Sequence, residues 1–116
     1  MNIEMLKTKI HRATVTDTDL NYEGSISLPK TLCKKANLLE FEKVDVYNCN
    51  NGARLSTYVI HGPENHICLN GAGARLACAG DKIIIASYAS FTKDEAAKFK
   101  PTIVLMDDKN RPSVKK

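Results

Sequence analysis

Short runs rich in Val, Ile, Thr and Tyr recur along the chain about every ten residues, and turn-forming residues separate them. Many short strands joined by brief helices are typical of a compact β-barrel. The most apolar β-branched run, 82–88, predicts a central strand. At 116 residues the chain has room for one hydrophobic core, so a single domain, 1–116, is expected. The other strands are predicted at 7–16, 20–28, 44–47, 54–60, 66–69 and 102–106.

Local signals predict the helices and turns between these strands. Pro29 suits a first helical position and predicts a helix over 30–37. Thr92 and Glu95 have the spacing of a capping box, which predicts a helix over 94–99. Asn51-Gly52 predicts a hairpin turn, because these residues tolerate positive φ angles. The polar segment 17–19 is predicted as a turn, and 74–79 as a helical turn.

The composition excludes several classes of protein. Hydrophobic residues make up 43% and charged residues 26%, as in ordinary soluble domains. The chain has neither the apolar run of about 18 residues that a membrane helix needs nor a signal peptide, so we expect a cytoplasmic protein. A net charge of only +4 and the lack of Trp argue against nucleic-acid binding. The scattered cysteines have no metal-ligand spacing and are expected to be free, buried thiols: Cys33, Cys49, Cys68 and Cys78.

The pair Gly24-Ser25 lies within a predicted extended segment, and alone it would be interpreted as a turn. Its surroundings change that interpretation. Four blocks occur in order along most of the chain: KIHRATVTDTDLNYEGS, NNGARLSTYVI, LNGAGARLACAGDKIIIASY and KPTIVLM. Together they resemble the aspartate 1-decarboxylases, small enzymes that cut their own chain at Gly-Ser.

The resemblance implies a fold, a cofactor and a reaction. The fold would be a six-stranded double-psi β-barrel with short helices. Cleavage between Gly24 and Ser25 would yield a short β chain, 1–24, and a long α chain, 25–116, with Ser25 converted to a pyruvoyl group. That group would form a Schiff base with L-aspartate and act as an electron sink during loss of CO₂, without a metal. The product, β-alanine, would supply pantothenate and coenzyme A, and the enzyme would be a homotetramer with sites shared between subunits.

The resemblance also assigns roles to residues around the cleavage site. Thr57 would donate to the oxyanion formed at the Gly24 carbonyl, and Tyr58 would be the catalytic proton donor beside Ser25. Arg54 and Lys9 would bind the substrate's carboxylates. The substrate-binding loop would be Gly71, Ala72 and Gly73, with Asn70, Tyr22 and Tyr47 in supporting roles. Gly73 departs from the family's usual alanine, and Tyr47 from a common tryptophan.

Each assignment has a simpler structural alternative. Thr57 suits a strand by β propensity alone, and an Arg on a strand is commonly an exposed surface charge. Tyr58 or Tyr22 could instead be a core aromatic with its hydroxyl satisfied. Strand alternation puts Arg54 and Tyr58 on one face and Thr57 on the other, so a bulge, barrel curvature or a neighbouring subunit must reconcile them. Other functions also remain open: a pyruvoyl decarboxylase for another acidic amino acid such as glutamate, a non-catalytic β-barrel binding module, or a chain that needs a maturation factor.

Overall fold

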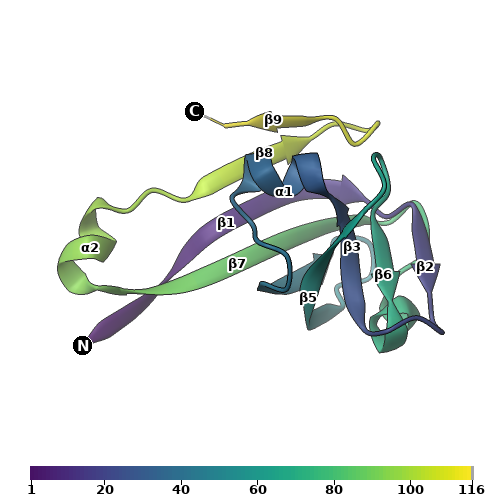
Figure 1. Cartoon of the computed structure of the whole chain (residues 1–116), viewed down its shortest axis with the longest axis horizontal. Coiled ribbons are helices and arrows are strands. Elements are labelled where there is room, and N and C mark those ends of the chain that lie inside the picture. The colour runs from purple at the N-terminus through teal and green to yellow at the C-terminus, as the bar shows by residue number, and fades with distance from the viewer. Residues whose placement is uncertain (116) are drawn as a thin grey trace.

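The computed structural model describes residues 1–115 and forms one mixed sheet with two short helices beside it (Figure 1). Within that range the strands follow the order β2-β6-β3-β5-β4-β7-β1-β8-β9. The bounds are β1 Asn2–Thr14, β2 Asp17–Asp19, β3 Ser25–Pro29, α1 Lys30–Ala36, β4 Lys43–Asn48, β5 Arg54–Gly62, β6 Cys68–Asn70, the 3₁₀ helix η1 Gly71–Leu76, β7 Lys82–Thr92, α2 Lys93–Lys98, β8 Thr102–Met106 and β9 Pro112–Val114.

The expectation of a mainly β protein is confirmed, but the strand count differs from six. The part of the chain that the structure describes has nine strands, and the edge strands β2 and β9 do not pair with each other, so the sheet is open. Six strands are five residues or longer, and the other three have three residues each. The additional strands are thus the short ones, β2, β6 and β9.

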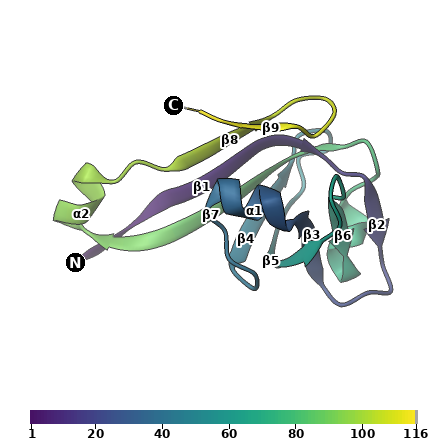
Figure 2. The ribbon, with the colours of Figure 1, turned by 45° about the horizontal axis from the view of Figure 1, so that its top comes forward.

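The two longest strands, β1 and β7, run side by side in antiparallel pairing (Figures 1 and 2). β7 also pairs with β4, so the predicted central position of the run at 82–88 is confirmed. Ile83 and Ile85 on β7 are fully buried, as is Ile10 on β1. Alternate residues of a strand point to opposite faces, so these side chains share one core-facing surface. Val46 and Val59 of β4 and β5 extend the same core.

Two short helices lie beside the sheet, and both were predicted. α1 buries Leu32, Cys33 and Ala36, and Asn37 ends it in the left-handed conformation with φ 58°. The Thr8 hydroxyl of β1 donates to the Ala36 carbonyl at 2.7 Å, which ties the end of α1 to the sheet. α2 begins with the predicted capping box, in which Thr92 and Glu95 satisfy each other's backbone amides.

Several predictions from local sequence are wrong. Asp17–Asp19 is a strand parallel to β6 rather than a turn, because residues 68–70 supply the pairing partners. Residues 20–24 do not continue an extended strand, since β3 begins only at Ser25. The helical turn at 74–79 begins earlier, at Gly71. Strand β9 was not anticipated. Of the four free cysteines, Cys33 and Cys68 are buried, but Cys49 and Cys78 are exposed.

Candidate active site

Ser25 is the first residue of β3 and is 1% exposed. Its hydroxyl donates to the Glu23 carbonyl at 2.9 Å and accepts a hydrogen bond from Asn70 Nδ2 at 3.0 Å. A buried hydroxyl is stable only when its hydrogen-bonding capacity is used, and here both a donor and an acceptor interaction are satisfied. The side chain is therefore held in one orientation immediately after Gly24.

Asn70 is brought to Ser25 by strand pairing. β3 and β6 are antiparallel, with Ser25 opposite Asn70 and Ser27 opposite Cys68. The Asn70 amide nitrogen donates to both serine hydroxyls at 3.0 Å, and the residue is only 4% exposed. The predicted supporting residue Asn70 thus lies in direct contact with the predicted reactive serine.

Gly71 is the position at which this site requires glycine. Its φ is +70°, and a Cβ atom added there would lie 2.6 Å from Gly24 Cα and 2.8 Å from Gly24 N. Real Cβ atoms essentially never approach so closely, so the backbone of residue 24 must shift if residue 71 acquires a side chain. The start of η1 therefore packs directly against the Gly24-Ser25 segment.

Gly24 itself is less constrained than the sequence suggested. Among the described atoms outside its chain neighbours, none lies within 4 Å of an added Cβ, and its φ is outside the left-handed region. The steric requirement for glycine therefore falls on Gly71, across the contact. Gly24 itself is exposed.

A surface pocket of about 290 Å³ opens beside Ser25. Tyr22 and Tyr58, both predicted site residues, line it together with Ser25. Tyr22 is 55% exposed, whereas Tyr58 is partly buried with its ring centroid 6.3 Å from that of Phe41. The two tyrosines therefore belong to the wall of the pocket and not to the core.

Five residues that line this pocket were not predicted as site residues: Glu23, Glu40, Phe41, Ile60 and His61. The His61 backbone amide donates to Glu40 Oε2 at 2.9 Å, which joins the segment after α1 to strand β5. Phe41 has a positive φ of 72° and is 71% exposed. The loop residues Glu40 and Phe41 carry no periodic pattern, so their place in the pocket had no sequence signal.

Thr57 lies on β5 two residues before Val59, where the parallel pairing with β3 begins opposite Ile26. Gly24 precedes the start of β3, so this strand pairing does not reach it. Tyr58 lines the pocket together with Ser25, whereas Thr57 does not line it. Of the two predicted β5 residues, the structure therefore brings Tyr58 to the pocket at Ser25.

Arg54 and Tyr47 form a separate group on the outer face of the sheet. The Arg54 guanidinium lies over the Tyr47 ring, 4.4 Å from its centroid, and Tyr47 and Tyr88 join their hydroxyls at 2.9 Å. This hydrogen bond raises the pKa of Tyr47 to about 12. The β4–β5 register runs unbroken from Arg54 to Tyr58, so no bulge brings Thr57 to the face that Arg54 and Tyr58 share. Four strand residues span about 13 Å, which separates Arg54 from the pocket at Ser25.

Lys9 and Gly73 are also away from this pocket. Strands β5, β4 and β7 lie between β1, which carries Lys9, and β3. Thr8 and Ile10 on either side of Lys9 are fully buried, so Lys9 points to the opposite face. An added Cβ at Gly73 would lie 3.2 Å from Leu55 Cδ1, so the family's alanine would need only a small side-chain movement. Ala72 between the two glycines is exposed.

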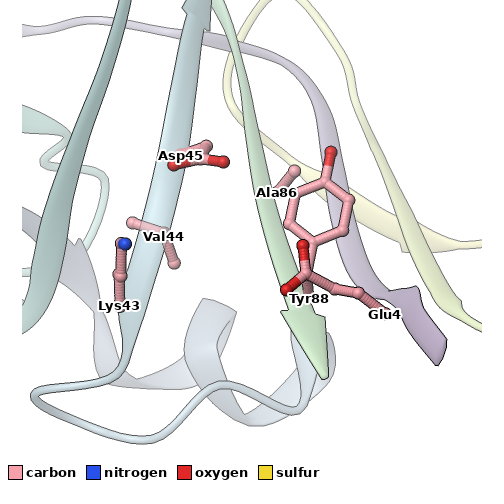
Figure 3. Close-up of a pocket in the computed structure, with 6 residues that line it drawn as sticks. All are labelled: Glu4, Lys43, Val44, Asp45, Ala86 and Tyr88. Atoms are coloured by element: carbon pink, nitrogen blue, oxygen red, sulfur yellow. The ribbon is translucent and has the colours of Figure 1, made fainter. Parts of the chain in front are cut away.

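A further pocket of about 140 Å³ lies between β4, β7 and β1 on the outer face (Figure 3). Its polar lining residues are Glu4, Lys43, Asp45 and Tyr88, and Glu4 lies beside the Tyr88 ring in Figure 3. The Asp45 carboxylate accepts a hydrogen bond from Ser56 at 2.6 Å. None of the predicted site residues lines this pocket. Within residues 1–115, no three His, Cys, Asp or Glu side chains are placed to hold a metal ion.

The fold and the site define a small, mainly β protein in which a buried serine, fixed after a glycine at the start of a strand, faces a tyrosine-lined pocket. The sequence model of the aspartate decarboxylase family matches residues 1–113. The chain belongs to this family.

Curated relatives named aspartate 1-decarboxylase match nearly the whole chain. The protein from Bdellovibrio bacteriovorus is 57% identical over 116 residues, covering 100% of this chain and 94% of the relative. The one from Campylobacter hominis is 58% identical and covers 95% and 96%. The one from Clostridium botulinum is 59% identical and covers 95% and 88%. No helix of the described residues is long and apolar enough to cross a membrane.

Proposed function

We propose that this chain decarboxylates L-aspartate to β-alanine and CO₂ after it has cut itself between Gly24 and Ser25. Membership of the aspartate decarboxylase family supports the reaction. The observation that carries the proposal is the placement of Ser25. Its hydroxyl is buried and held by Asn70 and the Glu23 carbonyl, and it directly follows an exposed glycine.

Cleavage would begin when Ser25 Oγ attacks the Gly24 carbonyl carbon and the acyl group moves from nitrogen to oxygen. An unactivated hydroxyl is a weak nucleophile, but fixed geometry gives effective molarities on the order of 10⁵ M or more. Asn70 and Gly71 supply that geometry. Thr57 is the proposed donor to the oxyanion, a role supported by the family resemblance and by its position next to Tyr58 on β5. Loss of the Ser25 Cα proton with cleavage of the Cβ–Oγ bond would then release the Gly24 carboxylate and leave dehydroalanine. Its imine tautomer would add water, which releases ammonia and leaves the pyruvoyl carbonyl.

The residues around Ser25 fit a pyruvoyl group at that position. Asn70 and Gly71 would hold it, and the pocket of about 290 Å³ gives access to it. A pyruvoyl group supplies an electron sink for the electron pair left when the α-carboxylate departs as CO₂. Tyr58 lines the same pocket, and we assign it the proton donor's role, with Tyr22 beside it.

Substrate carboxylates need cations, and the two predicted cations, Arg54 and Lys9, do not line the pocket at Ser25 of the same chain. Arg54 stacks on Tyr47 in another pocket, and Lys9 lies three strands further away. We therefore propose that neighbouring subunits of a homotetramer complete each site. Gly71, Ala72 and Gly73 at the start of η1 are the proposed substrate loop.

The finer description of the fold is also part of the proposal. The six longer strands are assigned to a double-psi β-barrel, and the parallel pairs β1–β8 and β3–β5 support crossover connections of this kind. The product is proposed to supply pantothenate and coenzyme A synthesis in the cytoplasm, in line with the family's activity.

Turnover by purified protein tests this function directly. We expect β-alanine from L-aspartate, little product from L-glutamate, and none from the Ser25→Ala variant, in which the hydroxyl is absent. Preferential turnover of glutamate would overturn the substrate assignment. Inactivity towards both acids, with an intact chain, would favour a binding module. A chain that becomes active only after addition of cell extract would indicate a maturation factor.

A further inference from the structure

The side-chain amide of Asn70 carries a nitrogen, which donates hydrogen bonds, and an oxygen, which accepts them. Which of the two faces Ser25 decides how the Ser25 hydroxyl is directed. Its nitrogen donates to Ser25 Oγ and Ser27 Oγ at 3.0 Å each. Its oxygen accepts a hydrogen bond from the Cys68 thiol, with Sγ to Oδ1 at 3.2 Å. Rotating the amide by half a turn would exchange the nitrogen and the oxygen, so that Ser25 would face an acceptor in place of a donor.

The two serines do not decide this orientation. A hydroxyl both donates and accepts, so Ser25 and Ser27 could satisfy either end of the amide. With the nitrogen towards it, Ser25 Oγ accepts from Asn70 and directs its own hydrogen to the Glu23 carbonyl. With the oxygen towards it, the serine hydrogen would be drawn to Asn70 instead. The direction of the hydroxyl therefore depends on the third neighbour, the thiol.

Cys68 is placed to act as a hydrogen-bond donor to Asn70. It is 3% exposed and two residues before Asn70 on β6, so both side chains point to the same face. Burial raises the pKa of its thiol, and the nearby Asp17 and Asp19 carboxylates add to the effect. A protonated thiol donates to an oxygen, whereas a thiolate would attract the amide nitrogen. The other acceptor near Sγ, the Leu69 carbonyl, is farther away at 3.8 Å.

We propose that Cys68 is a positioning residue for self-cleavage: its thiol holds the Asn70 amide with the nitrogen towards Ser25 and so orients the attacking hydroxyl. This inference rests on the proposed cleavage at Gly24-Ser25. Without this contact, Cys68 would resemble any other small buried side chain. Cys68 does not touch the scissile bond, and its effect passes entirely through Asn70.

The test compares cleavage rates of newly made chains in a reconstituted translation reaction, followed by intact mass. Cys68→Ala removes the donor, and we expect cleavage to slow about five- to tenfold, the effect of one net hydrogen bond. Cys68→Ser keeps a group that can donate to the Asn70 oxygen but can also accept from its nitrogen, so it should restore the rate only in part. Cys33→Ala, which removes a thiol that is 1% exposed within α1, should leave the rate unchanged. A wild-type rate in Cys68→Ala, or equal slowing in Cys33→Ala, would overturn the proposal.

If the wild-type chain is never cleaved, the proposed processing is refuted. A second readout tests the contact between Cys68 and Asn70 without any cleavage. In the uncleavable Ser25→Ala background, Asn70 keeps its Ser27 and Cys68 partners. Hydrogen exchange of the Asn70 side-chain amide, measured by NMR, should accelerate when Cys68→Ala is added and return towards the starting rate with Cys68→Ser. Unchanged exchange in the Cys68→Ala protein would contradict a role of the thiol in holding the amide.

Discussion

Replacing Gly71 with alanine tests whether contact between two distant loops holds the cleavage segment in place. The new Cβ would lie 2.6 Å from Gly24 Cα and 2.8 Å from Gly24 N, and 3.2 Å from the Tyr22 carbonyl oxygen. Ordinary contacts begin at 3.4 Å, so Gly24 must move by about 0.8 Å relative to residue 71. All three neighbouring atoms belong to the backbone, so no flexible side chain can absorb the change.

The displacement has two separable consequences. An alanine at a φ of +70° costs roughly 1–2 kcal/mol of stability in any context. A shift of nearly 1 Å between reacting groups costs on the order of 10²-fold in rate. We therefore expect a folded, modestly destabilised protein that cleaves about a hundredfold more slowly than the wild type.

Gly52→Ala is the matched control, because Gly52 has a φ of +77° and no described atom within 4 Å of an added Cβ. It should lose similar stability in urea denaturation and still cleave at the normal rate, as followed by intact mass over time. If Gly71→Ala folds and cleaves as fast as Gly52→Ala, the argument that Gly71 positions Gly24 is wrong.

Three further changes test the packing and electrostatics of the chain. Tyr88→Phe removes the hydrogen bond that raises the pKa of Tyr47 to about 12, so Tyr47 should titrate nearer about 10 by tyrosinate absorbance; an unchanged alkaline transition would contradict the hydroxyl pairing. Burial acts to raise the pKa of Glu42, but hydrogen bonds from a backbone amide, Lys7 and a serine outweigh it and hold this pKa below 4.5. Its stabilisation is therefore complete above that pH and is lost as the pH falls through the folded-state pKa. Glu42→Gln should accordingly lower the Tm at neutral pH and lower it less at acid pH, and a Tm difference that stays constant with pH would refute the linkage. Ile85→Ala should cost about 2–5 kcal/mol in urea denaturation because Ile85 is fully buried, and a loss under about 1 kcal/mol would contradict its place in the core.

Features encoded within a few residues were predictable from the sequence. Thr92 and Glu95 form the capping box because both partners belong to one turn of helix. Gly52 adopts the positive φ that the hairpin signal predicted. The parity of Arg54, Thr57 and Tyr58 also followed from strand alternation alone, and the unbroken register of β5 with β4 preserves it.

Features that depend on distant partners were not predictable. Asp17–Asp19 reads as a turn, yet it pairs with Cys68–Asn70 some fifty residues away, and tertiary pairing outweighs local preference. The contact between Gly71 and Gly24 and the thiol contact to Asn70 likewise arise from packing that no local motif encodes. The resemblance to a family supplied the predicted site residues and the expectation of sites shared between subunits, but only the structure shows which of them meet within one chain, since Arg54 lines another pocket and Lys9 lies on β1.

The proposed function depends on self-cleavage of the peptide bond between Gly24 and Ser25. Intact-mass spectrometry of the purified wild-type protein tests it most directly. The account predicts two chains, 1–24 and 25–116, with the longer one lighter by one ammonia than a chain that begins with serine. A single uncut chain of 116 residues that persists on prolonged incubation, alone and with cell extract, would contradict it.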